Sequence, residues 1–394
     1  MKEGWEYKKI GDCFSYIKNG ANIKQEKNAT GYPITRIETL SNGLFNRDRL
    51  GFANIFDLDK YQNYILKNKD ILMSHINSKT YIGRAVVYNK EDHEIIIHGM
   101  NLLRLIPYDF LYSDYAGYYF KTNKFKDDIA KIRKDAVNQS SFAISDLKNI
   151  LIPIPVSSIQ QQIVSELDLL SGVIEKQKAQ LEELDKLAQS IFYDMFGDPI
   201  TNEKGWEMKK LYEISNVGTG STPSRNNGKY YEGGAIPWVK TTEVQNCDIF
   251  ETEEKISELA IKETNCKVYP IGTLLLAMYG QGKTRGQLAK LRIEAATNQA
   301  CAAIVLNNDL SIPDYVYEYL HLQYENIRDM ARGGNQLNLN LNIVKAIPVF
   351  LPPLSLQQKF AAKVEAIEAM KAKVRQSLKE AETLFNERMD YYFN

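Results

Sequence analysis

Two stretches of the chain carry apolar residues at spacings that alternate between four and three, which predicts two long amphipathic helices. The apolar positions are Ile163, Leu167, Leu170, Ile174, Leu181, Leu184 and Ile191 in the first stretch, and Phe360, Val364, Ile367, Val374, Leu378 and Phe385 in the second. Such heptad spacing is typical of a coiled-coil seam. Proline-rich joints precede both stretches, and we expect Ser158 and Ser355 to cap the helices at their N-termini.

Polar residues interrupt the two apolar faces at different positions, with Gln177 in the first helix and Lys371 and Arg388 in the second. This difference favours two helices that pack on each other, with the polar residues helping to fix their register. In the alternative arrangement, each helix packs only on its own globular segment.

Chain lengths predict that the helix pair is antiparallel. A helix from Ile159 to Phe196 is about 57 Å long at 1.5 Å per residue. The link from Phe196 to Gly205 reaches about 30 Å when fully extended, which is too short for the return that a parallel pair requires. We therefore expect an antiparallel coiled coil that separates two globular segments and relates them by a pseudo-twofold axis.

Short β-like runs alternate with turns in both globular segments, which predicts mixed α/β structure. The expected strands, paired between the halves, are Asp70–Ser74 with Thr273–Ala277 and Tyr32–Ile37 with Ile236–Thr241; the expected helices are 114–120 and 314–320. Tyrosines such as Tyr115 and Tyr119 fall at helical spacing and are expected to pack in a core.

The chain is an internal repeat. Residues 4–12 (GWEYKKIGD) correspond to 205–213 (GWEMKKLYE), and from Asn138 onward a constant offset aligns the two halves without a gap. The predicted fold class is α+β, with two mixed domains in tandem. The predicted segments are a first domain at 1–152, a first long helix at 153–198, a second domain at 199–350 and a second long helix at 351–394.

Composition is that of an ordinary soluble protein, with 44% hydrophobic and 25% charged residues among 394. No apolar run approaches the roughly 18 residues of a membrane span, and we expect no membrane association. Net charge is zero, but residues 1–150 carry +5 (23 basic, 18 acidic) and residues 151–200 carry −5 (3 basic, 8 acidic). The chain alone is therefore expected to bind DNA weakly, with partners supplying much of the positive charge.

The spacing of cysteines and histidines does not match a metal site or a disulfide framework. The cysteines are Cys13, Cys247, Cys266 and Cys301, and the four histidines are equally scattered. No catalytic set emerges either, because nucleotide-cofactor fingerprints and nucleophile motifs are missing. We expect no metal, no catalytic residue and a reducing, cytoplasmic location.

The segment Ala277–Thr284 (AMYGQGKT) is one glycine short of a phosphate-binding GxxxxGK[ST] loop. A nucleotide-binding coiled-coil protein is therefore the alternative function. A working loop must open a helix, however, and Leu291–Ile293 favours another strand. A DNA-contacting loop between strands fits better, and an ordinary hairpin with solvated cations remains open.

Candidate DNA contacts lie in polar, turn-forming loops of both halves, because Arg, Asn and Gln can pair with base edges and Lys with phosphates. They are Arg36, Asn77, Lys79, Asn138, Gln139, Lys240, Tyr279, Gln281, Lys283, Arg285, Arg332, Asn335 and Gln336. For the Asn and Gln residues, a structural role in capping loops is equally open.

Four further motifs stand out: the Trp-x-x-Lys-Lys openings, the Ile-Pro-Trp-Val run at 236–239, the Ser-x-Gln-Gln segments at 158–161 and 355–358, and the run Leu187–Asp198. Together with the duplicated arrangement, they resemble the specificity (S) subunit of type I restriction–modification systems. The second copy departs at its end, where Asp390–Asn394 lacks Gly-Asp.

The resemblance covers essentially the whole chain and implies two target recognition domains, each reading one half of a bipartite site in double-stranded DNA. It also implies that the helices separate these domains and dock two methyltransferase (M) subunits, with two restriction (R) subunits where the system also cleaves. S-adenosylmethionine, ATP and Mg²⁺ would bind those partners and not this chain, which would be a non-catalytic subunit in a bacterial or archaeal cytoplasm. A self-sufficient modification enzyme is the third hypothesis, and the chain lacks its cofactor motifs.

Overall fold

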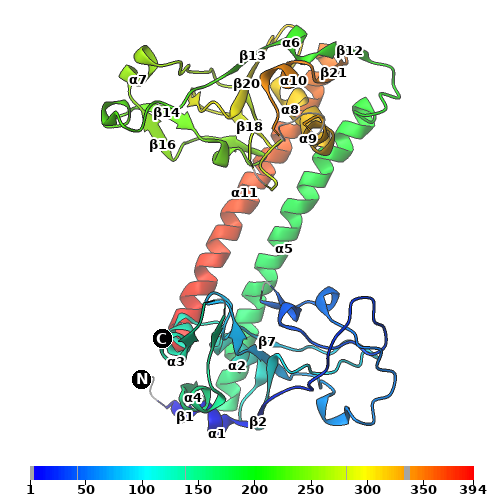
Figure 1. Cartoon of the computed structure of the whole chain (residues 1–394), viewed down its shortest axis with the longest axis vertical. Helices are drawn as coiled ribbons and strands as arrows, with labels where there is room; N and C mark the ends of the chain where they lie inside the picture. Colours follow the sequence, from blue (N-terminus) through cyan, green and yellow to red (C-terminus); the bar gives the residue numbers. More distant parts are fainter. Residues whose placement is uncertain (1–3, 42, 138, 281, 332–337) are drawn as a thin grey trace. The chain divides into compact units, whose positions relative to one another are not determined.

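The computed structural model describes residues 4–41, 43–137, 139–280, 282–331 and 338–394. The chain divides into two compact units, and Figure 1 labels many of their elements. Unit 1 contains Met1–Gln177 together with Ser377–Asn394, and unit 2 contains Lys178–Gln376. Each unit therefore combines one globular segment with parts of both long helices.

Unit 1 is built on an antiparallel four-stranded sheet in the order β2–β8–β5–β7. These strands are β2 (Phe14–Asn19), β8 (Leu102–Pro107), β5 (Ile71–Ser74) and β7 (Ala85–Val87). The predicted strand at 70–74 thus begins one residue later, and β5 is buried along its whole length. This burial follows from the position of β5 between β8 and β7 inside the sheet.

Smaller elements of unit 1 surround this sheet. They are β1 (Glu6–Lys9), α1 (Ile10–Cys13), β3 (Leu40–Ser41), β4 (Leu44–Phe45), β6 (Ile76–Asn77), α2 (Ser113–Tyr119), α3 (Asn123–Ile132), β9 (Lys134–Asp135), β10 (Ser140–Ser141), α4 (Ile144–Asn149) and β11 (Leu151–Ile154), with 3-10 turns at 37–39, 47–49 and 62–64. Strands β1 and β11 pair antiparallel, so the start of the chain closes against the proline joint.

Unit 2 repeats this plan with a five-stranded sheet in the order β13–β20–β17–β18–β15. Its elements are β12 (Glu207–Lys210), α6 (Leu211–Ile214), β13 (Ser215–Thr219), β14 (Ile236–Val239), β15 (Cys247–Ile249), β16 (Glu254–Ile256), α7 (Glu258–Glu263), β17 (Leu274–Ala277), β18 (Leu288–Leu291), β19 (Ala296–Thr297), β20 (Cys301–Leu306), α8 (Pro313–Leu322), α9 (Tyr324–Asp329), α10 (Leu341–Lys345) and β21 (Pro348–Leu351), with 3-10 turns at 228–230 and 241–243. The pair β12–β21 corresponds to β1–β11.

One predicted strand is wrong. Tyr32–Ile37 contributes only isolated bridges, in which Ile34 meets Gly51 and Ile97. Gly51 and Ile97 lie outside the named strands, so the run has no strand beside it with which to form a continuous ladder. The corresponding run in unit 2 does form a strand, β14.

The two long helices are α5 (Ser157–Phe196) and α11 (Leu354–Phe393). In unit 1, Ile163 near the start of α5 shares one core with Phe393 at the end of α11. In unit 2, Phe196 at the end of α5 shares a core with Phe360 near the start of α11. In both units the helices pack together and run antiparallel.

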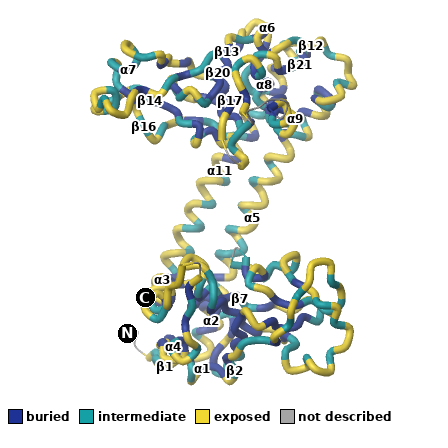
Figure 2. The backbone as a smooth tube through the Cα atoms, in the orientation of Figure 1, coloured by how far each residue is buried: buried dark blue, intermediate teal, exposed yellow. Residues whose placement is uncertain are grey.

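Burial along the helices follows the heptad pattern, and Figure 2 shows exposed and less exposed residues alternating on both. Ile163, Leu167, Phe360 and Ile367 are buried, while Leu170, Ile174, Leu181, Leu184, Ile191, Val364, Val374, Leu378 and Phe385 are half-buried. At Gln177, Nε2 donates to Ser377 Oγ over 2.6 Å. This polar interruption therefore has a partner on the facing helix.

The helix starts differ from the expected serine caps. Both helices begin one residue before the expected capping position, so Ser158 and Ser355 lie inside the first turn. Fully buried Gln160 and Gln357, the equivalent residues of the repeat, secure the two helix starts. Gln160 Nε2 donates to the Pro155 carbonyl (2.9 Å), and Gln357 Nε2 donates to the Pro352 carbonyl (2.9 Å).

Candidate nucleic-acid interface

In unit 1, a small three-stranded ribbon, β6–β10–β9, brings together candidate residues that are far apart in sequence. Asn77 of β6 lies opposite Ser140 of β10, next to exposed Gln139. Lys79 Nζ lies 3.0 Å from Asp135 Oδ2 on β9. The structure therefore places Asn77, Lys79 and Gln139 on one polar surface.

The charge of this surface is balanced by Asp135. The pKa of Asp135 is lowered to about 2, first by the hydrogen bond from the Ser140 hydroxyl and next by those from Lys79 and Arg133. A DNA phosphate that binds Lys79 must compete with this carboxylate. Since Lys79 and Asp135 are both solvent-exposed, the competition is weak.

The loop between β6 and β7 also carries two residues that the sequence did not single out. Tyr81 is exposed, and the Arg84 guanidinium lies 4.4 Å from the centre of its ring. Ser74 Oγ donates to the Tyr81 carbonyl over 2.7 Å and fixes the loop to β5. The aromatic and cationic residues that follow Lys79 in the sequence could have indicated a nucleic-acid contact here.

In unit 2, the corresponding loop joins β17 to β18 and carries Tyr279, Lys283 and Arg285. Lys283 and Tyr279 are exposed, and Arg285 is half-buried. Because β17 and β18 are antiparallel neighbours, the loop closes a hairpin and opens no helix. This geometry excludes the phosphate-cradling helix N-terminus that the nucleotide-binding alternative needs.

Both units place this loop beside the segment that precedes the proline joint. In unit 1, the Phe142 amide donates to the His75 carbonyl over 3.2 Å. In unit 2, the Leu339 amide donates to the Met278 carbonyl over 3.1 Å. The two copies thus share one backbone contact, between the residue that follows the buried strand and the segment that leads to the proline joint.

Arg36 and Lys240 occupy equivalent positions, each directly before a 3-10 turn. Arg36 Nε lies 3.5 Å from Glu38 Oε2, and Lys240 Nζ lies 2.5 Å from Glu253 Oε2. Lys240 follows β14, which belongs to the β16–β14–β19 sheet and not to the loop hairpin. Five further candidates, Asn138, Gln281, Arg332, Asn335 and Gln336, lie outside the described residues.

Comparison with known proteins decides the family. The model of the type I restriction modification DNA specificity domain matches residues 2–186 and again 203–382, which is most of the chain. The chain belongs to this family. Each match spans one globular segment and most of the helix that follows it.

Individual relatives agree with this family assignment. Over 392 residues the chain is 29% identical to a Methanocaldococcus jannaschii protein assigned as the MjaX type I restriction enzyme specificity subunit, covering 93% of this chain and 88% of that protein. It is 28% identical to the MjaIX specificity subunit of the same organism, covering 67% of this chain and 64% of that protein. The crystal structure of a type I S subunit from M. genitalium shares the fold, with a TM-score of 0.63, 16% identity and coverage of 99% and 96%.

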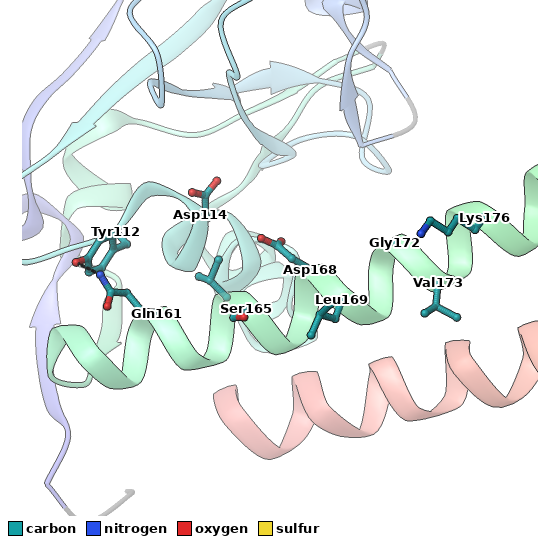
Figure 3. Close-up of a pocket in the computed structure, with 10 residues that line it drawn as sticks. Tyr112, Asp114, Gln161, Ser165, Asp168, Leu169, Gly172, Val173 and Lys176 are labelled. Carbon is teal, nitrogen blue, oxygen red and sulfur yellow. Dashed lines mark hydrogen bonds between the residues drawn. The ribbon is translucent and has the colours of Figure 1, made fainter.

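This specificity subunit carries a groove of about 550 Å³ in unit 1, between α2 and α5. Figure 3 shows Asp114 and Asp168 on its sides and Leu169 and Val173 along α5. Asp168 accepts a hydrogen bond from the Tyr118 hydroxyl (2.5 Å), and Asp114 pairs with Lys69 (3.0 Å). The acidic groups of the groove are thus engaged within the fold.

The described part of the chain offers neither a metal site nor a membrane span. Within residues 4–41, 43–137, 139–280, 282–331 and 338–394, no cluster of three His, Cys, Asp or Glu side chains is arranged to hold a metal ion. Over the same residues, every helix is too short or too polar to cross a lipid bilayer.

Proposed function

We propose that this chain is the subunit that recognises the DNA sequence for a type I restriction–modification complex, with each unit contacting one half of a bipartite site. The supporting observation is a contact repeated in both units, between the loop after the buried strand and the segment before the proline joint, marked by the His75–Phe142 and Met278–Leu339 hydrogen bonds. Two copies of one loop arrangement with different side chains suit a site with two different halves.

Within each unit, we assign cations to the phosphate backbone and planar polar groups to the bases. Lys79 in unit 1 and Lys283 in unit 2 are exposed and suit phosphate contacts. Asn77 in unit 1 and Arg285 in unit 2 suit base edges, because amides pair with adenine and guanidinium groups with guanine. The candidates outside the described residues, including Gln281 and Asn335, remain part of this proposal.

The helices serve as the scaffold for two methyltransferase subunits. Leu187 of α5 and Leu384 of α11 hold equivalent repeat positions and are 44% and 45% exposed. Because the same exposed apolar residue occurs once on each helix, each helix could bind one copy of the same partner. The groove lined by Leu169 and Val173 adds apolar surface on α5.

We further propose that catalysis resides in the partners. S-adenosylmethionine would bind the methyltransferase subunits, and ATP and Mg²⁺ would bind restriction subunits where these are present. The chain itself would be non-catalytic and would act in the cytoplasm, where its DNA is. Methyl transfer by the isolated chain would contradict this division.

The direct test is a domain exchange. Residues 20–135 are replaced by the matching segment of another family member, and the chain is expressed with its methyltransferase partner. Methylome sequencing should show one half-site changed and the other retained. A matched exchange of the segment between β13 and α8 should alter the opposite half-site. Methylation that ignores sequence in the parent complex would refute the proposal.

A further inference from the structure

Helix α9 holds the β17–β18 loop of unit 2, described over residues 278–280 and 282–287, through two side chains. The Tyr324 hydroxyl donates to the Lys283 carbonyl over 2.5 Å. Arg328 Nη2 donates to the Gly282 carbonyl over 2.9 Å, and its Nη1 donates to the Arg285 carbonyl over 3.2 Å. Three carbonyls within four residues of the loop are therefore tied to one helix.

The two side chains also support each other. Arg328 Nη1 donates to the Tyr324 hydroxyl over 2.5 Å, and its guanidinium lies 5.0 Å from the centre of the tyrosine ring. A guanidinium offers several donors in a fixed plane, so a single arginine can satisfy several acceptors at once. Arg328 and Tyr324 form one clamp.

The loop approaches this clamp closely. Gly286 has a φ of +88°, and a Cβ placed there would lie 2.9 Å from Arg328 Cγ. Gly280 and Gly282 also have positive φ values, of +138° and +64°. The glycines therefore let the loop adopt turns that other residues rarely adopt, and the clamp fixes the resulting shape.

The corresponding loop of unit 1 is supported by different chemistry. There Gly83, with a φ of +78°, lies against Ile129 of α3, and a Cβ on it would be 2.9 Å from Ile129 Cγ1. Both units thus brace the loop with the helix that follows α2 or α8. The polar clamp belongs to unit 2, whereas unit 1 uses an apolar side chain.

We propose that Arg328 and Tyr324 are positioning residues for recognition of the second half-site, holding the loop in the shape in which Lys283 and Arg285 meet DNA. The clamp directs its bonds to loop carbonyls, which leaves the Lys283 side chain exposed toward solvent. A loop ordered before binding does not lose conformational freedom on contact with DNA. This inference rests on the proposed function, in which the loop contacts the second half-site.

The test uses the complex of the full chain with its methyltransferase partner. The cognate site is taken from methylome sequencing of cells that express the parent complex. Discrimination is the ratio of methylation rates on the cognate duplex and on a duplex substituted in one half-site. Tyr324→Phe and Arg328→Met should each lower discrimination at the second half-site by about tenfold and leave the first unchanged.

Controls separate positioning from general stability. Asn326→Gln alters an exposed residue of the same helix, between the two clamp residues, and should leave both ratios unchanged. The Tm of each variant is measured by thermal unfolding. Arg328→Lys, which keeps a positive charge and hydrogen-bond donors, should retain more discrimination at the second half-site than Arg328→Met does. An equal loss at both half-sites, together with a lowered Tm, would overturn the inference.

The double variant Lys283→Ala/Arg285→Ala tests the DNA contact of the loop separately from the positioning role of Arg328 and Tyr324. If this loop variant lowers discrimination at the second half-site but the clamp variants do not, the inference fails and the proposed function stands. If the loop variant changes neither half-site, the role proposed for the loop fails, and the inference fails with it.

Discussion

Arg388 of α11 donates through Nη2 to Glu166 Oε2 of α5 over 3.0 Å, although 222 residues separate them in the sequence. A second bond joins Arg388 Nε to Glu166 Oε1, and Tyr392 contacts the same carboxylate. The interaction lowers the pKa of Glu166, with the Arg388 bond as the largest cause. One polar cluster thus joins the start of α5 to the end of α11 within unit 1.

This ion pair should be measurable by a double-mutant cycle. Glu166→Gln, Arg388→Met and the double variant are compared by urea unfolding. Both side chains are about one-third exposed, so we expect a coupling energy of about 1 kcal/mol and no more. Exposed Glu183 on the same helix serves as the control, and Glu183→Gln should show no coupling to Arg388. A coupling near zero for Glu166 would mean that the pair is not formed in solution.

The buried glutamines should matter more than their exposed neighbours. Gln160→Leu removes the bonds to Pro155, to the Phe110 carbonyl and to the Tyr112 amide, leaving buried polar groups without partners. We expect a loss of about 2–3 kcal/mol in the free energy of unfolding. Exposed Gln358, substituted by leucine, is the control and should cost less than about 0.5 kcal/mol. Equal effects would contradict the role assigned to the buried amide.

Acid should weaken unit 1 through Glu94. Burial alone would raise the pKa of this carboxyl, but hydrogen bonds from Arg47, the Glu91 amide and Tyr88 lower it to about 2 from its usual 4.5. A carboxyl whose pKa falls on folding stabilises the fold above about pH 4.5, and that contribution disappears as the pH falls toward 2. It amounts to at most about 3 kcal/mol. The stability difference between the parent and Glu94→Gln, measured by urea unfolding, should therefore shrink over this range, and a constant difference would contradict this account.

The helices should set the spacing between the half-sites. One added heptad lengthens a helix by about 10 Å, which is close to the length of three base pairs. Inserting a heptad after Lys178 in α5, and another at the facing position of α11, should lengthen the unread gap by about three base pairs. Both half-sites should remain the same in methylome sequencing. An unchanged gap would show that the helices do not separate the recognition domains.

The helices were the part of the fold most open to prediction. Ile163, Leu167 and Phe360 follow a spacing that only a helix brings to one face, and these residues are buried. The strand predicted at 32–37 does not form, because the residues that lie beside it belong to loops and offer only isolated bridges. The sequence pattern therefore predicted the long helices well, because their apolar residues recur regularly. It predicted the run at 32–37 poorly, because the residues beside that run belong to irregular loops.

The roles of polar residues were harder to predict. Gln160 is buried because its partners arrive from Phe110 and Tyr112, about fifty positions earlier, and no local pattern encodes that meeting. The near-complete phosphate loop at 277–284 was easier to judge, because the strand-like run at 291–293 already favoured a loop between strands, and β18 does follow the loop. Tyr324 and Arg328 were missed because their acceptors are backbone carbonyls. The candidate DNA contacts themselves remain predictions.

Phe393 packs against Tyr115 in unit 1, with ring centroids 5.3 Å apart, and Phe196 packs against Tyr315 in unit 2 at 4.9 Å. The first globular segment is therefore synthesised early, but its core is complete only after the end of α11 has also been synthesised. A premature stop within the codons for the end of α11 would damage the half that was synthesised first.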